Sequence, residues 1–117
     1  MTPRLEGVEA QAMEYVWEHG QATVRELMQA LDDEKPRAYT TYMTVLVRLH
    51  KKGLLDRREQ DGAMVYTPRI THEAYVQADV KALIQQHGDL ALSEFARQVA
   101  ELDPERRAAL ERLADGE

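Results

Sequence analysis

Basic side chains are concentrated in residues 35–58 of an otherwise acidic chain. The 117 residues carry a formal net charge of −6, yet this segment holds seven lysines and arginines and a single acid, Asp56. A local excess of positive charge is typical of a surface that binds a polyanion such as nucleic acid. The chemistry indicated first is therefore phosphate binding, and the candidate residues are Arg37, Arg48, Lys51, Lys52, Arg57 and Arg58.

Short polar side chains lie within the same segment, ahead of most of the basic ones. A threonine hydroxyl can bond either type of base, and its methyl group can contact the methyl of thymine. Because the chain holds no asparagine, we expect base reading to depend on thymine methyls and on DNA shape. The alternative is that these are ordinary surface residues. The residues predicted to read base edges are Thr40, Thr41, Met43 and Thr44.

Catalytic and metal-binding patterns are not found in the sequence. The lack of cysteine excludes disulfides, thiolate metal sites and cysteine nucleophiles. Ser93 is the one serine and is not in a Gly-x-Ser-x-Gly motif. His87 with Asp89 or Glu94 is an alternative metal site at a subunit interface, but surface histidines are the favoured interpretation. We therefore predict no enzyme, no cofactor and no metal.

Three short helices are predicted in the first half of the chain. Apolar residues at helical spacing indicate a helix over residues 5–18. Thr23 and Glu26 form a capping box that opens a second helix, which runs to about Leu31. Pro36 interrupts the chain before a third helix over residues 39–52. The third helix has an apolar stripe formed by Tyr42, Val45, Leu46 and Leu49.

A β-hairpin is predicted after the third helix. Asp61-Gly62 is a strong two-residue turn signal, and pairing outward from it places Arg57 opposite Tyr66. Three helices followed by a hairpin is the order of a winged helix-turn-helix domain. We therefore expect a mostly α fold with a small β-hairpin wing, and a DNA-binding domain over residues 1–70. Its third helix would enter the major groove.

Three further helices are predicted in residues 71–117, which we expect to be a dimerisation domain. Thr71, Asp89 and Asp103 are the expected N-caps, and Pro104 follows the last of them. These helices carry too few large apolar residues for a stable core. They either pack on the winged domain or pair with a second copy, and a two-fold dimer is the commoner solution. The expected interface residues are Tyr75, Leu83, Leu92, Phe95, Val99, Leu102, Leu110 and Leu113.

Two further expectations follow from apolar residues. The chain has no run of about 18 apolar residues and no apolar signal core near its start, so we expect a cytoplasmic protein without a membrane span. Trp17 and Phe95 are expected to be core residues rather than the walls of a ligand pocket.

Four motifs in residues 5–68 have a characteristic order and spacing. They are the apolar run Leu5 to Trp17, Ala22-Thr-Val-Arg-Glu26, the run Tyr39-Thr-Thr-x-Met-Thr-Val-Leu to Gly53, and Val65-Tyr66-x-Pro68. The motifs resemble the BlaI/MecI/CopY family of penicillinase repressors. The segment from Leu102 to Leu113 is similar to the last helix of that family.

The resemblance implies a homodimeric repressor that binds double-stranded, palindromic operator DNA, often with TACA and TGTA half-sites. It places recognition-helix contacts on Thr40, Thr41, Met43, Thr44 and Arg48. In the β-lactam-responsive members, a membrane sensor protease signals the antibiotic and the repressor is cleaved, so the resemblance implies control of β-lactam resistance or a related stress response.

This chain departs from the family pattern at three points. Ala38-Tyr39 stands where the family often has Ser-Pro at the start of the recognition helix. Phe95 follows Glu94, whereas the cleavage site of the staphylococcal members is Asn-Phe. The lack of cysteine excludes the copper-responsive branch. The alternative function is a winged-helix module that binds an acidic protein partner through the same basic face.

Overall fold

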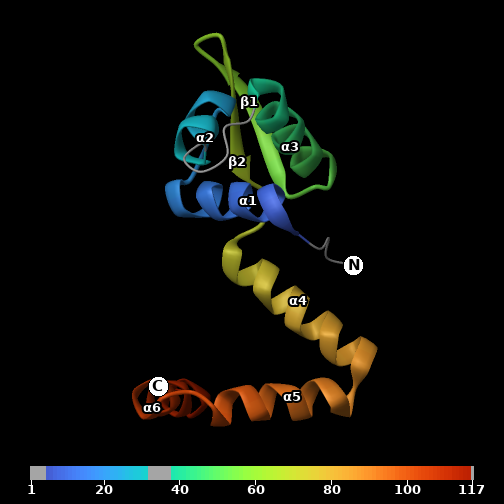
Figure 1. The fold of residues 1–117 in the computed structure, drawn as a ribbon, viewed down its shortest axis with the longest axis vertical. Helices are drawn as coiled ribbons and strands as arrows, with labels where there is room; N and C mark the ends of the chain where they lie inside the picture. Colours follow the sequence, from blue (N-terminus) through green and yellow to red (C-terminus); the bar gives the residue numbers. More distant parts are fainter. Residues whose placement is uncertain (1–4, 32–37, 117) are drawn as a thin grey trace. The chain divides into compact units, whose positions relative to one another are not determined.

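The computed structural model describes residues 5–31 and 38–116. The chain divides into two units, residues 1–77 and residues 78–117. Figure 1 labels the elements of both units. The elements are α1 (Gly7–His19), α2 (Val24–Leu31), α3 (Tyr39–Lys51), β1 (Leu55–Gln60), β2 (Ala63–Pro68), α4 (His72–His87), α5 (Asp89–Ala100) and α6 (Pro104–Ala114).

The first unit is a winged helix, and its core is built from α1, α2, α3 and the hairpin. The predicted apolar stripe of α3 is confirmed, since all four of its residues are buried. Burial of such side chains is the main stabilising term, at about 1.5–3 kcal/mol for each large one. The largest fully buried side chains include Met13 of α1, Leu27 of α2 and Leu55 of β1. The core therefore anchors α3 on one side and leaves its other side at the surface.

The hairpin has the predicted turn and register. Arg57 pairs with Tyr66, and the neighbouring pairs follow the same antiparallel order. Asp61 and Gly62 both have positive φ, 52° and 82°, as a type I′ turn requires. The turn projects beyond the helices in Figure 1. Ala22 also exchanges two backbone hydrogen bonds with Tyr66, at 2.9 and 2.8 Å. The segment before α2 is therefore attached to β2, a contact that no sequence pattern predicted.

The helix ends of the first unit follow the local sequence. The capping box is confirmed: the Glu26 amide donates to Thr23 Oγ1 at 3.1 Å, and the Thr23 amide donates to Glu26 Oε1 at 2.9 Å. By contrast, α3 begins after Ala38, whose side chain makes no cap hydrogen bond. Gly53 follows the end of α3 with a φ of 82°, the left-handed conformation that favours glycine.

The start of α4 packs against α1 within the first unit. Thr71 Oγ1 accepts from the Ala74 amide at 3.0 Å, which confirms the predicted cap. The Trp17 indole donates to the Ile70 carbonyl at 2.9 Å and stacks on the His72 ring at 4.3 Å. Tyr75 is buried beside Trp17. These contacts tie the first turn of α4 to the winged helix.

The second unit contains the end of α4 together with α5 and α6. Asp103 caps α6 by accepting from the Arg106 amide at 2.9 Å, and Pro104 is the first helical residue, as predicted. The predicted cap at Asp89 is wrong. Gly88 takes the N-cap position with a φ of 57°, and Asp89 is already helical. A residue with positive φ is favourable for glycine and unfavourable for aspartate. Gly88 therefore occupies the N-cap position of α5 that the sequence had assigned to Asp89.

Apolar side chains of the second unit are largely exposed. Among its described residues, 78–116, only Ala91 is buried. Leu92 and Leu113, two of the expected interface residues, are 50% and 70% exposed. Within the part of the chain that the structure describes, no helix is long and apolar enough to cross a membrane.

Candidate nucleic-acid interface

The exposed side of α3 carries a polar stripe. Thr41, Thr44, Arg48 and Lys51 are separated by three or four residues and are all exposed. Residues at this spacing share a helix face. Thr40 is exposed beside them. The structure therefore brings together the predicted threonines, at the helix start, and two predicted phosphate-binding residues, toward its end.

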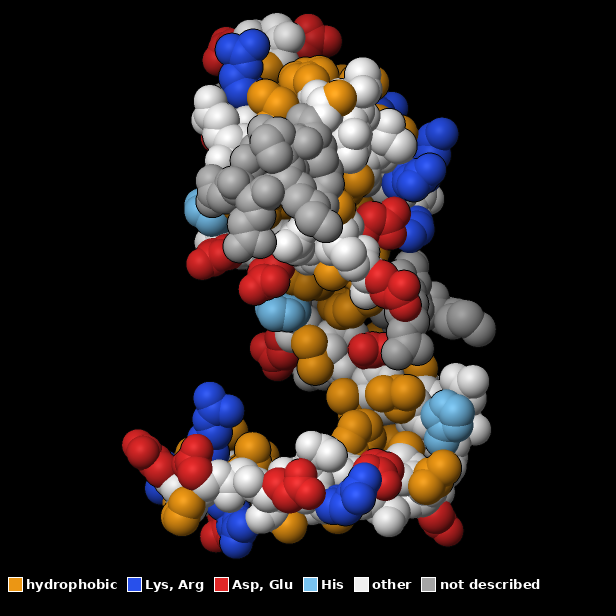
Figure 2. Space-filling model, in the orientation of Figure 1, with side chains coloured by type: hydrophobic (Ala, Val, Ile, Leu, Met, Phe, Trp, Pro, Cys, Tyr) orange, Lys and Arg blue, Asp and Glu red, His pale blue; other side chains and the backbone are white. Residues whose placement is uncertain are grey.

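The basic residues of α3 differ in whether they already have partners. Figure 2 shows Lys and Arg side chains grouped on the side of the first unit that α3 forms. Among the described residues, no ion pair engages Arg48 or Lys51. Lys52, however, lies 2.7 Å from a carboxylate oxygen of Glu9 in α1. Arg37, the first of the predicted phosphate-binding residues, lies outside the described residues.

The wing carries the other two predicted phosphate-binding residues. Arg57 and Arg58 are both exposed on β1. Arg58 donates to Gln60 Oε1 at 3.0 Å and to Gln21 Oε1 at 3.5 Å. Arg57 has no hydrogen bond or ion pair with another described residue. Adjacent strand residues point to opposite faces, so the two arginines do not act as one cluster.

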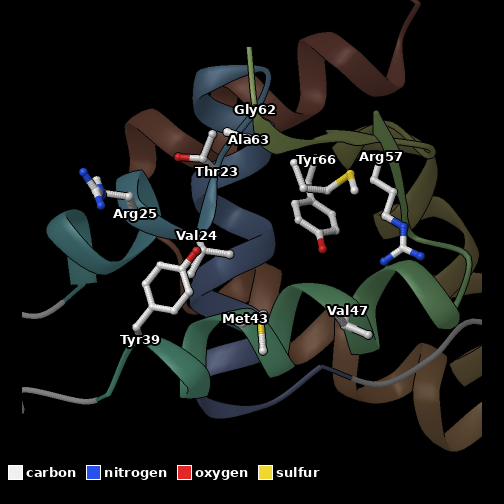
Figure 3. Close-up of a pocket in the computed structure, with 11 residues that line it drawn as sticks. Thr23, Val24, Arg25, Tyr39, Met43, Val47, Arg57, Gly62, Ala63 and Tyr66 are labelled. Atoms are coloured by element: carbon white, nitrogen blue, oxygen red, sulfur yellow. The ribbon is translucent and has the colours of Figure 1, made fainter. Parts of the chain in front are cut away.

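A second stripe of α3 faces an open hollow of about 570 Å³. We call it the wing hollow, and Figure 3 shows it close up. Met43 belongs to this stripe, with Tyr39 and Val47 four residues to either side, and not to the stripe of Thr41 and Thr44. The wing hollow is lined by Thr23, Val24 and Arg25 of the α2 start, by Tyr39, Met43 and Val47, and by Arg57, Gly62, Ala63, Met64 and Tyr66 of the hairpin.

Sequence reasoning missed this second stripe. Tyr39, Met43 and Val47 recur every four residues, a spacing that places them on one face of a helix. The signal was present, but it lies beside the stronger apolar stripe that enters the core. Arg25, which comes from a different helix, had no sequence signal connecting it to the wing.

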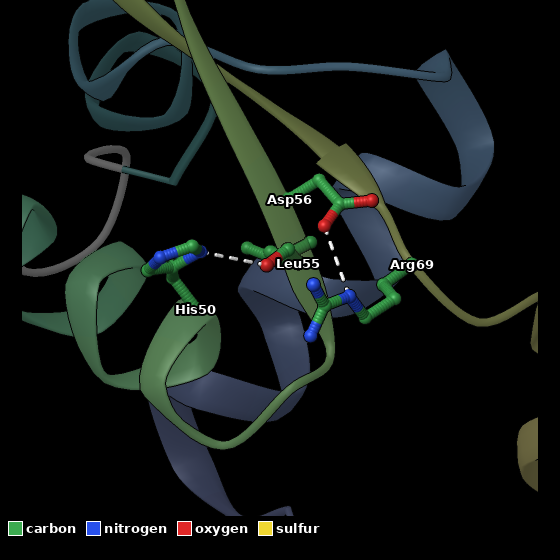
Figure 4. A network of polar contacts seen from close by, with 4 residues as sticks. All are labelled: His50, Leu55, Asp56 and Arg69. Carbon is green, nitrogen blue, oxygen red and sulfur yellow. Dashed lines mark hydrogen bonds and ion pairs between the residues drawn. The ribbon is translucent and has the colours of Figure 1, made fainter.

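Polar contacts fix the junction between α3 and β1. The His50 Nδ1 lies 2.9 Å from the Leu55 carbonyl oxygen and, since a carbonyl only accepts, this nitrogen donates. Arg69 Nε donates to Asp56 Oδ1 at 2.9 Å at the base of the hairpin (Figure 4). The first contact joins the end of α3 to β1, the strand that carries Arg57, and the second joins β1 to the segment that follows β2.

Three of the four histidines have structural partners. His50 holds β1 as described, His19 donates to the Tyr15 carbonyl at 2.9 Å, and His72 stacks on Trp17. Among the described residues, no group of three or more potential metal ligands is found. These three histidines therefore have partners within their own chain, which the interpretation as surface histidines did not predict.

The predicted dimer residues fall into two groups. Tyr75 lies in the core of the first unit, so its side chain already has neighbours in its own chain. The others belong to the second unit. Leu83, Phe95, Val99 and Leu102 are half-buried, whereas Leu92, Leu110 and Leu113 are exposed.

The fold and the polar, basic stripe of α3 define the class: a winged helix-turn-helix protein. A family model described as "Penicillinase repressor" matches residues 6–116. The chain therefore belongs to the penicillinase repressor family, as the motifs predicted. This is a family of transcriptional repressors, so the protein is a repressor and not an enzyme.

Individual relatives agree with this assignment. The chain is 36% identical over 116 residues to "Transcriptional regulator BlaI" of Mycobacterium tuberculosis, a match that covers 92% of this chain and 84% of the relative. It is 25% identical over 101 residues to "Penicillinase repressor" of Bacillus licheniformis, a match that covers 86% of this chain and 79% of the relative.

Two solved structures resemble the first unit. One is the solution structure of the DNA-binding domain of the repressor BlaI, with a TM-score of 0.55 and 29% identity. The other is the solution structure of the Bacillus licheniformis BlaI monomeric form in complex with the blaP half-operator, with a TM-score of 0.53 and 29% identity. Each match covers 64% of this chain and 92% of the other chain. The predicted winged-helix fold is confirmed.

Proposed function

We propose that the protein represses transcription by binding a palindromic operator as a homodimer, with α3 in the major groove. The observation that carries the proposal is the exposed stripe of Thr41, Thr44, Arg48 and Lys51 on a helix whose other side is buried. Threonines near the helix N-terminus suit base edges, and basic residues near its C-terminal end suit phosphates. A relative of this chain has been solved in complex with a half-operator, which supports DNA as the partner.

The charge distribution supports DNA as the partner. Phosphate contacts supply most of the affinity of such proteins and make it depend on salt. Arg48 and Lys51 are available for phosphates without breaking an ion pair between described residues. The acidic remainder of the chain disfavours non-specific binding elsewhere on its surface.

Dimerisation is the second part of the proposal. The predicted interface residues of the second unit need a partner surface, and a two-fold dimer buries the same patch twice. Three of them are exposed, namely Leu92, Leu110 and Leu113. A dimer of winged helices would read half-sites whose centres lie about 34–36 Å apart, one turn of DNA. We therefore assign the proposed dimer surface to the second unit, without Tyr75.

Control of β-lactam resistance or a related stress response is the physiological part of the proposal. It rests on family membership. A sensor protease is the proposed partner for release, although Glu94-Phe95 replaces the Asn-Phe of the staphylococcal cleavage site. Exposing cells to a β-lactam and following the repressor by immunoblot tests this part, since proteolytic release predicts a shorter fragment.

A gel-shift titration with DNA from the gene's own upstream region tests the DNA interface. Arg48→Ala should weaken binding to that DNA and to unrelated DNA by a similar factor, because the variant no longer neutralises a phosphate. Thr41→Ala should instead reduce the preference for the upstream DNA over unrelated DNA. For each phosphate that a variant leaves unneutralised, the slope of log affinity against log salt should become shallower by about 0.9. Binding that does not depend on salt, or capture of an acidic protein with no DNA shift, contradicts the proposal.

A further inference from the structure

The wing hollow concentrates apolar surface on the side of the winged helix that faces solvent. Tyr39, Met43 and Met64 are 49%, 41% and 39% exposed, and all three line it. From residue 5 to residue 75, they are the only large apolar side chains of the described chain that are exposed to this extent. Exposed apolar side chains gathered in a hollow, rather than scattered, are typical of a binding site.

Both charged residues among the described lining of the wing hollow are arginines, and Glu59, the strand partner of Met64, is not a lining residue. None of its described lining residues is acidic, although the chain contains 21 acids. Arg25 and Arg57 lie at opposite edges in Figure 3. Thr23, Val24 and Arg25 also form the N-terminal end of α2, where the amide groups of Val24 and Arg25 have no intrahelical acceptor. Helix N-termini favour anions, and the Glu26 carboxylate already accepts from the Thr23 amide at this one. The complementarity of the hollow to a negative group therefore comes mainly from Arg25 and Arg57.

A polar group reaches the hollow from its floor. Tyr66 is only 2% exposed, and its hydroxyl points toward α3 in Figure 3. Within the described part of the chain, this hydroxyl has no hydrogen-bond partner, and it is not sealed from solvent. A buried tyrosine whose hydroxyl opens into a hollow offers an oriented hydrogen bond to an occupant.

From these features, we infer that the wing hollow binds a small amphipathic carboxylate, whose apolar body contacts Met43 and Met64 and whose charge meets Arg57 or Arg25. The volume of about 570 Å³ is within the range of small-molecule sites. The regulatory consequence rests on the proposed function. An occupant between α3 and the wing competes with DNA, because it covers Arg57 and lies beside the base-reading stripe of α3. The carboxylate is therefore an inducer that releases the repressor.

Methyl NMR of protein labelled with ¹³C at the methionine methyls tests the site directly, with 1-naphthoate as the probe. Met43 and Met64 line the hollow, whereas Met13 is fully buried and Met28 is not a lining residue, so the chain contains its own controls. We expect saturable shifts of the Met43 and Met64 signals, with Met13 and Met28 unchanged. The neutral analogue 1-naphthylmethanol should bind at least several-fold more weakly.

Two variants locate the charge and the cavity. Arg57→Gln should weaken 1-naphthoate binding about ten-fold, the effect of one charge-assisted hydrogen bond. Ala63→Phe, at an exposed lining position, should fill the hollow and abolish binding while both arginines remain. Arg97→Gln, outside the hollow, is the matched control. Trp17 fluorescence reports whether each variant is folded. Equal shifts at Met13, Met28, Met43 and Met64, or equal binding of the alcohol, overturn the inference.

Competition with DNA separates this inference from the proposed function. Saturating 1-naphthoate should weaken binding to the upstream DNA about ten-fold, a common coupling between two sites, and should have no such effect on Ala63→Phe. If the naphthoate binds and DNA affinity does not change, the regulatory role is wrong. If the protein binds no DNA, the proposed function fails, and the methyl shifts still decide whether the hollow binds a carboxylate.

Discussion

Basic side chains toward the end of α3 and just after it differ in whether they already have a partner. Arg48 is without an ion pair among the described residues, whereas Lys52 lies against Glu9. Glu9 is the less exposed member of the pair, at 18% against 35% for the Lys52 side chain. A phosphate that recruits Lys52 must therefore displace or share a carboxylate. We therefore expect Glu9 to weaken DNA binding without contacting DNA.

Replacing Glu9 should strengthen DNA binding. Glu9→Gln releases Lys52 for a phosphate, so we expect affinity to rise by about three- to ten-fold and the salt slope to steepen by about 0.9. An exposed ion pair contributes at most about 1 kcal/mol to stability, so the fold should persist. Fluorescence anisotropy at several salt concentrations measures both quantities. Glu14 is an exposed residue of the same helix, so Glu14→Gln changes the net charge equally and should raise DNA affinity less. An equal rise of DNA affinity in both variants would assign the effect to net charge alone.

At the scale of elements, α2 is held at its start by a reciprocal pair of hydrogen bonds. Thr23→Ala removes the acceptor for the Glu26 amide, so we expect the free energy of unfolding to fall by about 1 kcal/mol. Urea denaturation followed by circular dichroism measures the change. Thr23→Ser keeps the hydroxyl acceptor and should retain most of the stability. If Thr23→Ser lowers the free energy of unfolding as much as Thr23→Ala does, the methyl group of Thr23 matters more than its cap hydrogen bond.

At the start of α3 a substitution should increase stability, since the Ala38 side chain provides no cap. Its backbone is extended, with φ −67° and ψ 150°, as an N-cap residue requires. Ala38→Ser should therefore raise the free energy of unfolding by about 0.5–1 kcal/mol. Ala38→Asp should stabilise at least as much, yet its charge at the end of the recognition helix should repel phosphate and weaken DNA binding. Urea denaturation and a DNA titration of both variants separate the two effects, and similar DNA affinities would argue against a phosphate near Ala38.

The elements that followed from the sequence are those with a local cause. The Thr23–Glu26 box, the Asp61-Gly62 turn and the Asp103-Pro104 start each depend on residues within a few positions of one another. The attachment of Ala22 to Tyr66 and the pairing of Glu9 with Lys52 join residues far apart in the chain. Long-range contacts of this kind depend on how the elements pack, and no local sequence pattern predicts them.

The candidate site was predictable to a similar extent. The threonines and basic residues of the recognition helix could be named because one helix presents them at regular spacing. The wing hollow could not, because Arg25, Met43 and Met64 come from three different elements. Met43 was grouped with the threonines by its position in sequence, but the helix turns it toward the wing.

At the scale of the whole molecule, the two units differ in how much core they have. The exposed basic stripe belongs to the first unit, whereas the second unit leaves Leu90, Leu92 and Leu113 at its surface, at 66%, 50% and 70% exposed. With Ala91 as the one buried residue among its described members, the second unit lacks the core that a stable domain needs. Stability of the second unit should then depend on protein concentration.

Dimerisation can be tested on α5 with a matched pair of substitutions. Leu92 shares a helix face with Phe95 and Val99, whereas Leu90 lies about 200° away around the helix. We expect Leu92→Asp to produce a monomer in sedimentation velocity and Leu90→Asp to leave the dimer intact. Because linked half-sites act at high effective concentration, the monomer should lose about a hundred-fold or more in affinity for a full palindrome while keeping its affinity for a half-site. A wild-type chain that sediments as a monomer at micromolar concentration, or a Leu92→Asp variant that remains dimeric, would place the interface elsewhere.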